Sequence, residues 1–147
     1  MTLEAGFCAA AAIMEMLLQS WGGAIRLFPT GPDRWGDAYF EDLRAEGAFL
    51  VSAQLSGGNV AWVRIVSEAG ADCTLRNPWP GEEVTVRGPD GIETLSGEDL
   101  AWETEAGAAY LVHPAGDPPD DAALSPDPPL RPEWQSNWFG LREVPRF

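Results

Sequence analysis

The stretch from Glu15 to Pro32 joins an apolar helix to an extended run, and this join constrains the fold more than any other feature of the sequence. From Leu3 to Leu18, apolar side chains recur at helical spacing, at Leu3, Phe7, Ala10, Met14, Leu17 and Leu18. Because alanines fill the intervening positions, we expect this helix to be buried on more than one side. Gly22 and Gly23 are predicted to end the helix, and prolines stop the extended run that follows.

A secretory or lipoprotein leader is the alternative interpretation of this apolar segment. No basic residue precedes the apolar run, and Glu4 and Glu15 interrupt it. Phe7 is a poor match to the small residue that precedes a lipidated cysteine. The segment is also too short and too charged to span a bilayer. The sequence therefore favours a structural helix and predicts no membrane partner.

The middle of the chain predicts short strands separated by turns. Residues alternate in polarity from Phe49 to Leu55, and Gly57-Gly58-Asn59 turns the chain into a second run from Val60 to Val66. Further extended runs are predicted at Cys73–Asn77, Val84–Arg87, Glu93–Leu95, Leu100–Thr104 and Ala108–His113. This pattern predicts a mainly β fold, an antiparallel β-sandwich preceded by one N-terminal α-helix.

The composition changes after Val112. The segment from Pro114 to Pro132 is rich in proline and aspartate, so we expect an extended connector rather than an independent unit. Four large apolar residues follow it, at Trp134, Trp138, Phe139 and Leu141. We expect them to dock on the main body as a final strap, with a wholly disordered tail as the alternative. The predicted organisation is a helix at 1–22, a sandwich at 23–115, and a connector with a strap at 116–147.

The charge balance and the cysteines narrow the classes of partner. The chain has a net charge of −14 and nine arginines with no lysine, which argues against nucleic acid or anionic membrane as partners. A neutral sugar fits this balance better. Cys8 and Cys73 lack metal-ligand spacing, and two buried free thiols are favoured over a disulfide. His113 is the single histidine, for which a structural role is favoured. We predict no metal site and no cofactor.

Four segments together carry a resemblance to a known family. They are Phe7–Ser20, Ile25–Pro32, Leu43–Phe49 and Leu75–Trp79, in this order. The combination resembles the C-terminal part of glycoside hydrolase family 95, the α-L-fucosidase family, over about the first 115 residues. The resemblance implies the last helix of a truncated (α/α)6 catalytic barrel followed by a β-rich domain. The implied partners are the upstream barrel of the same polypeptide and a carbohydrate substrate.

The resemblance also implies a chemistry, most of which lies outside this chain. Inverting glycosidases use a carboxylic acid to protonate the leaving oxygen and a second group to activate water. The family's general acid and water-holding asparagines lie upstream, so this segment is predicted to support the barrel and to be inactive alone.

One catalytic residue is implied within the chain. The family shows Asp-Gly-Asn-Phe-Gly before its last barrel helix, and Glu4-Ala5-Gly6-Phe7-Cys8 aligns with it here. Glu4 then occupies the acidic position that acts on water, whereas Gly6 departs from the family's asparagine. The alternative is an acidic residue placed in the first helical turn by the helix dipole.

Two tryptophans are candidates for binding carbohydrate. Trp62 and Trp79 are predicted to be the most exposed of the rings, and an aromatic plane can stack on the apolar face of a sugar. Core packing is the alternative and the more common use of tryptophan. Three functions remain open: the structural C-terminal part of a glycoside hydrolase, a non-catalytic carbohydrate-binding β-sandwich, and a scaffold without a ligand.

Overall fold

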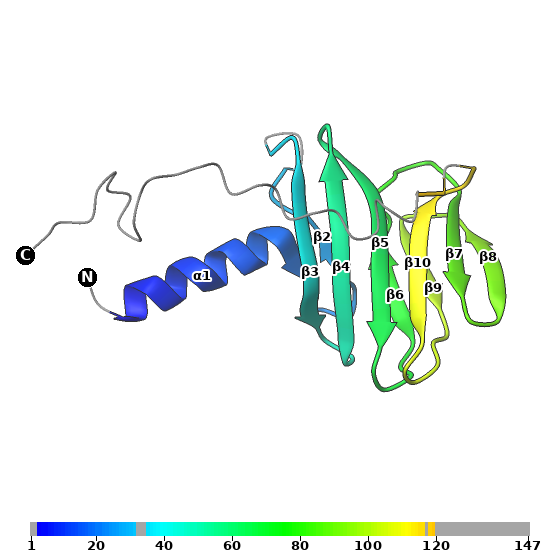
Figure 1. The fold of residues 1–147 in the computed structure, drawn as a ribbon, viewed down its shortest axis with the longest axis horizontal. Helices are drawn as coiled ribbons and strands as arrows, with labels where there is room; N and C mark the ends of the chain where they lie inside the picture. Colours follow the sequence, from blue (N-terminus) through cyan, green and yellow to red (C-terminus); the bar gives the residue numbers. More distant parts are fainter. Residues whose placement is uncertain (1–2, 32–34, 117, 120–147) are drawn as a thin grey trace, which may run out of the picture.

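The structure, a computed structural model, describes residues 3–31, 35–116 and 118–119. Within these residues one helix precedes ten short strands, which confirms the predicted mainly β class (Figure 1). The elements are α1 (Leu3–Leu17), β1 (Leu18–Gln19), β2 (Arg26–Leu27), β3 (Ala38–Ala45), β4 (Phe49–Ser56), β5 (Asn59–Ser67), β6 (Cys73–Arg76), β7 (Val84–Gly88), β8 (Gly91–Leu95), β9 (Asp99–Trp102) and β10 (Ala109–Pro114). The predicted strap lies outside the described residues.

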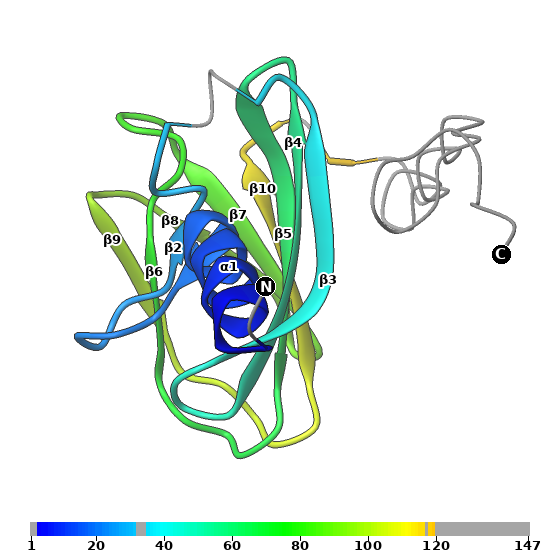
Figure 2. The ribbon, with the colours of Figure 1, turned by 90° about the vertical axis from the view of Figure 1, so that its left-hand side faces the viewer.

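The strands form two layers, as expected for a sandwich. Six of them make one antiparallel sheet in the order β3-β4-β5-β10-β7-β8. The pairs β1-β2 and β6-β9 make a second layer, and a parallel bridge between Ile25 and Leu75 connects them. Ile25 N donates to Thr74 O at 2.8 Å, and Arg76 N donates to Ile25 O at 2.8 Å. Figure 2 shows the two layers facing each other.

The core lies between these layers and confirms the predicted alternation. Val51 and Ala53 of β4 are fully buried, as are Val63 of β5 and Leu75 of β6. Burying an aliphatic side chain of this size contributes about 1.5–3 kcal/mol. The turn between β4 and β5 is also as predicted, because Gly57 and Gly58 have the positive φ values that a tight hairpin needs (56° and 81°). The sandwich therefore has a continuous core of its own.

β3 is a strand that the polarity pattern did not predict. Its register shifts between Phe40 and Leu43, and Asp42 has a φ of 51° at this bulge. The Asp42 backbone N–H donates to Ser52 Oγ at 3.0 Å. Because the bulge interrupts the period of two, consecutive acidic residues replace the alternation that marks a strand.

The helix ends earlier than the two glycines indicated. α1 stops at Leu17, and the chain enters β1 at Leu18, which pairs with Leu27 of β2. Gly22 and Gly23, with φ values of 81° and 83°, instead form the turn between β1 and β2. The expectation that they terminate the helix is wrong, because the chain pairs as a strand from Leu18 onward, four residues before Gly22.

Candidate functional site

The N-terminal helix projects from the sandwich (Figure 1). Phe7, Ile13 and Met14 are 66%, 56% and 51% exposed, and α1 meets the core through its last turn, where Leu17 packs. The expectation of burial on more than one side is therefore not met within the described residues. A helix of this composition normally hides its apolar surface. α1 thus presents an apolar surface for which the described part of the chain supplies no cover.

Glu4 lies in the first turn of this helix and is exposed. That turn is the end of α1 farthest from the strands (Figure 1). Trp62 lies in β5, and Trp79 follows β6. The structure therefore does not bring Glu4 together with the two tryptophans. Any catalytic use of this carboxylate requires groups from beyond the described residues.

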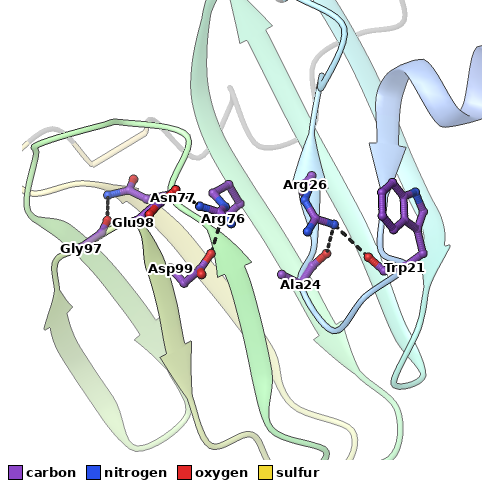
Figure 3. Close-up of polar contacts among 8 residues, drawn as sticks. All are labelled: Trp21, Ala24, Arg26, Arg76, Asn77, Gly97, Glu98 and Asp99. Atoms are coloured by element: carbon purple, nitrogen blue, oxygen red, sulfur yellow. Dashed lines mark hydrogen bonds and ion pairs between the residues drawn. The ribbon is translucent and has the colours of Figure 1, made fainter.

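The turn between β1 and β2 is held by one arginine. Arg26 Nη1 donates to Trp21 O at 2.9 Å and to Ala24 O at 3.3 Å (Figure 3). The guanidinium carbon lies 5.1 Å from the centroid of the Trp21 ring, within the range of a cation–π contact. Leu18, the first residue of β1 directly after the helix, belongs to the sandwich core. These contacts tie the base of α1 to the β-domain.

The segment Leu75–Trp79, which carried part of the family resemblance, has structural contacts throughout. Arg76 forms an ion pair with Asp99, with Nε to Oδ1 at 3.0 Å (Figure 3). Asn77 is buried, and its Nδ2 donates to Gly97 O at 2.9 Å. These bonds join β6 and the loop after it to β9 and the loop before it. The contacts of this motif therefore hold the second layer together.

Trp62 and Trp79 line one cavity, with a volume of about 620 Å³. They are 1% and 6% exposed, so the prediction that these are the exposed rings is wrong. Trp62 Nε1 donates to Gln54 Oε1 at 2.9 Å, and Trp79 Nε1 donates to Val60 O at 2.6 Å. Each indole is thus packed and hydrogen-bonded in place, which leaves little ring surface for stacking on a sugar.

Polar side chains complete the wall of this cavity. Its other lining residues include Gln54, Ser56, Asn59 and Glu82. Amide, hydroxyl and carboxylate groups are the groups that hydrogen-bond sugar hydroxyls. Proximity of these groups to the two tryptophans arises from the pairing of β4 with β5 and from the loop after β6. Sequence reasoning found the two rings but not the polar residues, since their spacing along the chain carries no signal.

A second cavity of about 310 Å³ lies between the β7-β8 hairpin and β9. Trp102 and Tyr110 line it, with ring centroids 6.2 Å apart. The backbone N–H of Glu105 donates to the Tyr110 hydroxyl at 2.8 Å. Trp102 Nε1 is buried without a hydrogen-bond partner among the described residues. The lining of this cavity is aromatic and acidic, with Glu93 and Glu103 among its other residues.

The thiols differ in environment. Both are free, but only Cys73 is buried as expected, because Cys8 lies on the exposed helix. Burial raises the pKa of Cys73 to about 12, so its thiol stays protonated and unreactive near neutral pH. Over the described residues no group of three potential ligands could hold a metal ion. The same part of the chain contains no helix long and apolar enough to cross a membrane.

The family model for glycoside hydrolase family 95, C-terminal domain, matches residues 19–112. No curated protein matches the chain. The match begins in β1 and ends in β10, so it covers the two-layered β-domain and leaves α1 outside it. It confirms the resemblance that the sequence motifs indicated.

Proposed function

This chain belongs to glycoside hydrolase family 95, through the C-terminal domain of that family, and we propose that it supports the catalytic barrel of an inverting, α-L-fucosidase-like glycosidase. In this proposal α1 (Leu3–Leu17) is the last barrel helix, the strands from β1 to β10 form the domain that follows it, and residues 116–147 are a connector and strap. The observation that carries the proposal is the exposed apolar surface of α1, held to the sandwich at its base.

The helix needs a partner on physical grounds. An isolated helix shorter than about 12–15 residues is marginal in water, and tertiary packing supplies most helical stability. α1 has 15 residues, yet only its last turn packs on the sandwich. Other barrel helices would cover Phe7, Ile13 and Met14 in the way that helices of a barrel cover each other. The upstream catalytic barrel is therefore the partner that this surface fits.

Glu4 receives a role only in that assembled state. At the N-terminus of the docked helix, its carboxylate would act on the nucleophilic water while an upstream acid protonates the leaving oxygen. Both groups are needed to flank one sugar, and the acid is not among the residues that the resemblance assigns to this chain. We therefore expect no hydrolysis by the isolated chain.

The test supplies the two parts separately. An aryl α-L-fucoside is incubated with the chain alone, with a family 95 catalytic barrel lacking its last helix, and with both together. Release of the aryl group is expected only from the mixture. Glu4→Gln should lower kcat of the mixture and leave the Kd between the chain and the barrel unchanged. Glu15→Gln, on the same helix, should change neither kcat nor this Kd. Hydrolysis by the purified chain alone, lost in Glu4→Gln, would overturn the proposal.

A non-catalytic carbohydrate-binding sandwich is the second candidate, favoured by the single cavity that Trp62 and Trp79 share with polar side chains. Glycan binding by the isolated chain would support it. Because both rings are packed, Glu82→Gln tests the cavity without removing a core side chain, and Trp21→Ala is the control on an exposed ring. Binding that survives Glu82→Gln and the loss of either buried tryptophan would exclude this cavity.

A further inference from the structure

One face of the six-stranded sheet points away from the second layer, and we call it the outer face. Val63 and Val112 are paired across β5 and β10, and both are fully buried in the core. Side chains alternate between the faces of a strand, so the adjacent residues Trp62 and His113 lie on the outer face. Trp62 accordingly falls outside the core cluster that contains the two valines. The second layer and α1 lie on the other side of the sheet (Figure 2).

The central residues of this outer face are nevertheless buried. Trp62, Ser52 and His113 are 1%, 2% and 3% exposed, and they come from three adjacent strands. An antiparallel sheet can leave one face to solvent. Here β3 covers part of the outer face, because the Tyr39 ring lies 6.1 Å from the Trp62 ring between centroids and Asp42 is hydrogen-bonded to Ser52. The strands of the second layer cannot cover the rest, because they lie across the core.

The imidazole of His113 indicates what chemistry the cover carries. Its Nδ1 lies 2.9 Å from Pro114 O, and because a carbonyl oxygen only accepts, Nδ1 holds the proton. Nε2 is therefore an acceptor, and it is buried with no hydrogen-bond partner among the described residues. A buried acceptor without a donor destabilises the fold, because it has lost its hydrogen bond to water. A matching partner would bring an N–H or O–H group to this position.

Charge on the outer face points to an acidic partner. Arg64 of β5 and Arg87 of β7 both pair with Leu111 of β10, so they flank one apolar side chain. Arg64 forms an ion pair with Asp42, with Nη1 to Oδ1 at 3.6 Å, and its side chain remains 40% exposed. Two arginines side by side are notable in a chain with a net charge of −14. A segment that combines carboxylates with apolar rings would complement this surface.

We propose that the outer face is the docking surface for this chain's own C-terminal segment, residues 120–147. The described chain reaches Pro119, which lines the same cavity as Trp62. The segment begins with Asp120 and Asp121 and later carries Trp134 and Trp138, whose indole N–H groups are donors. It thus contains the apolar rings, the donors and the carboxylates that the outer face requires. The proposal does not depend on the catalytic role proposed above.

The connector is long enough for this docking. Extended chain covers at most about 3.3–3.6 Å per residue, so Trp134 can lie up to roughly 50 Å from Pro119. Six strands spaced about 4.8 Å apart span roughly 24 Å. Trp134 and Trp138 can therefore reach any point of the outer face without strain.

A cysteine reporter tests the docking in the full chain. Thr85 pairs with His113 and lies half-buried on the outer face. The reactivity of a cysteine at this position therefore measures how well the outer face is covered. Thr74→Cys, half-buried on the opposite side of the molecule, is the matched control. Both substitutions are made in a Cys8→Ser background. The remaining thiol, Cys73, should not react with the reagent, because it is buried and its pKa is raised to about 12. The rate of modification by a soluble disulfide reagent is measured at neutral pH.

The expected result is a rise of at least tenfold in the modification rate at position 85 when Trp134→Ala and Trp138→Ala are introduced together. The rate at position 74 should not change, which also verifies that the sandwich remains folded. Trp21→Ala, on the exposed ring at the helix base, should leave both rates unchanged. Equal rates at position 85 with and without the two C-terminal tryptophans would overturn the proposal. Protection that grows with protein concentration would also overturn it, because a second copy would then be the cover.

Discussion

Replacing the apolar surface of α1 should weaken docking to the catalytic barrel and leave the sandwich intact. The variant is Phe7→Gln, Ile13→Gln and Met14→Gln together, since glutamine keeps the helix propensity. Fully burying such a side chain is worth about 1.5–3 kcal/mol, so the exposed fractions of 66%, 56% and 51% correspond to roughly 3–5 kcal/mol in total. Docking to the barrel should therefore weaken by about a hundredfold to a few thousandfold in Kd.

The assay measures two quantities on the same proteins. The Kd for the separately produced barrel is obtained by titration calorimetry, and the unfolding free energy of the isolated chain by urea denaturation. The triple variant should change the unfolding free energy by less than about 0.5 kcal/mol, since exposed positions contribute little. Ile92→Gln is the matched control, because Ile92 is 67% exposed but lies on β8. An unchanged Kd would refute the reasoning, as would a loss of several kcal/mol in the isolated chain.

Three further predictions concern the sandwich. Leu75→Ala should cost about 2–5 kcal/mol of unfolding free energy in urea, because this fully buried side chain belongs to the strand that the bridge ties to β2; a cost below 1 kcal/mol would contradict that role. Gly47→Ala should lower the thermal midpoint, because Gly47 has a φ of 84° and an added Cβ would lie 2.7 Å from the Phe49 ring; an unchanged midpoint would show that the turn can shift. Because burial raises the pKa of Cys73 from 9.0 to about 12, the unfolded thiol ionises first. The contribution of Cys73 to the unfolding free energy should be constant below about pH 9 and fall as the pH rises from 9 to 12. A Cys73→Val variant should therefore have a shallower slope in this range, with a residual slope above pH 10 from Tyr39, whose pKa burial also raises.

Local chemistry explains the parts of the fold that the sequence predicted. The β4-β5 hairpin was predictable because alternation from Phe49 to Leu55 and the pair Gly57-Gly58 depend only on neighbouring residues. The missed strand, β3, contains a bulge at Asp42, which is hydrogen-bonded to Ser52 on the neighbouring strand β4. The helix end was misplaced for the same reason, since β1 exists only through its pairing with β2.

The candidate site was less predictable than the fold. Trp62 and Trp79 were recognised as a pair of interest, and they do line one cavity. They were predicted to be the most exposed rings, with core packing as the alternative, and the structure has both of them buried. The hydrogen bonds from their indole N–H groups to Gln54 and Val60 form only in the folded chain. Glu4 rests on alignment with a family motif, which states nothing about the surroundings of a side chain.

By itself, the sequence determined the class of the fold, the hairpin turns, the apolar helix and the family, because these follow from residue order and local conformational preference. Only the tertiary structure decided which surfaces are open and which are closed. It left Phe7, Ile13 and Met14 exposed on α1 and buried Trp62 and His113 on the outer face. The physical reason is that burial is a property of packed layers, and which elements pack together is settled by pairings between residues far apart in the chain.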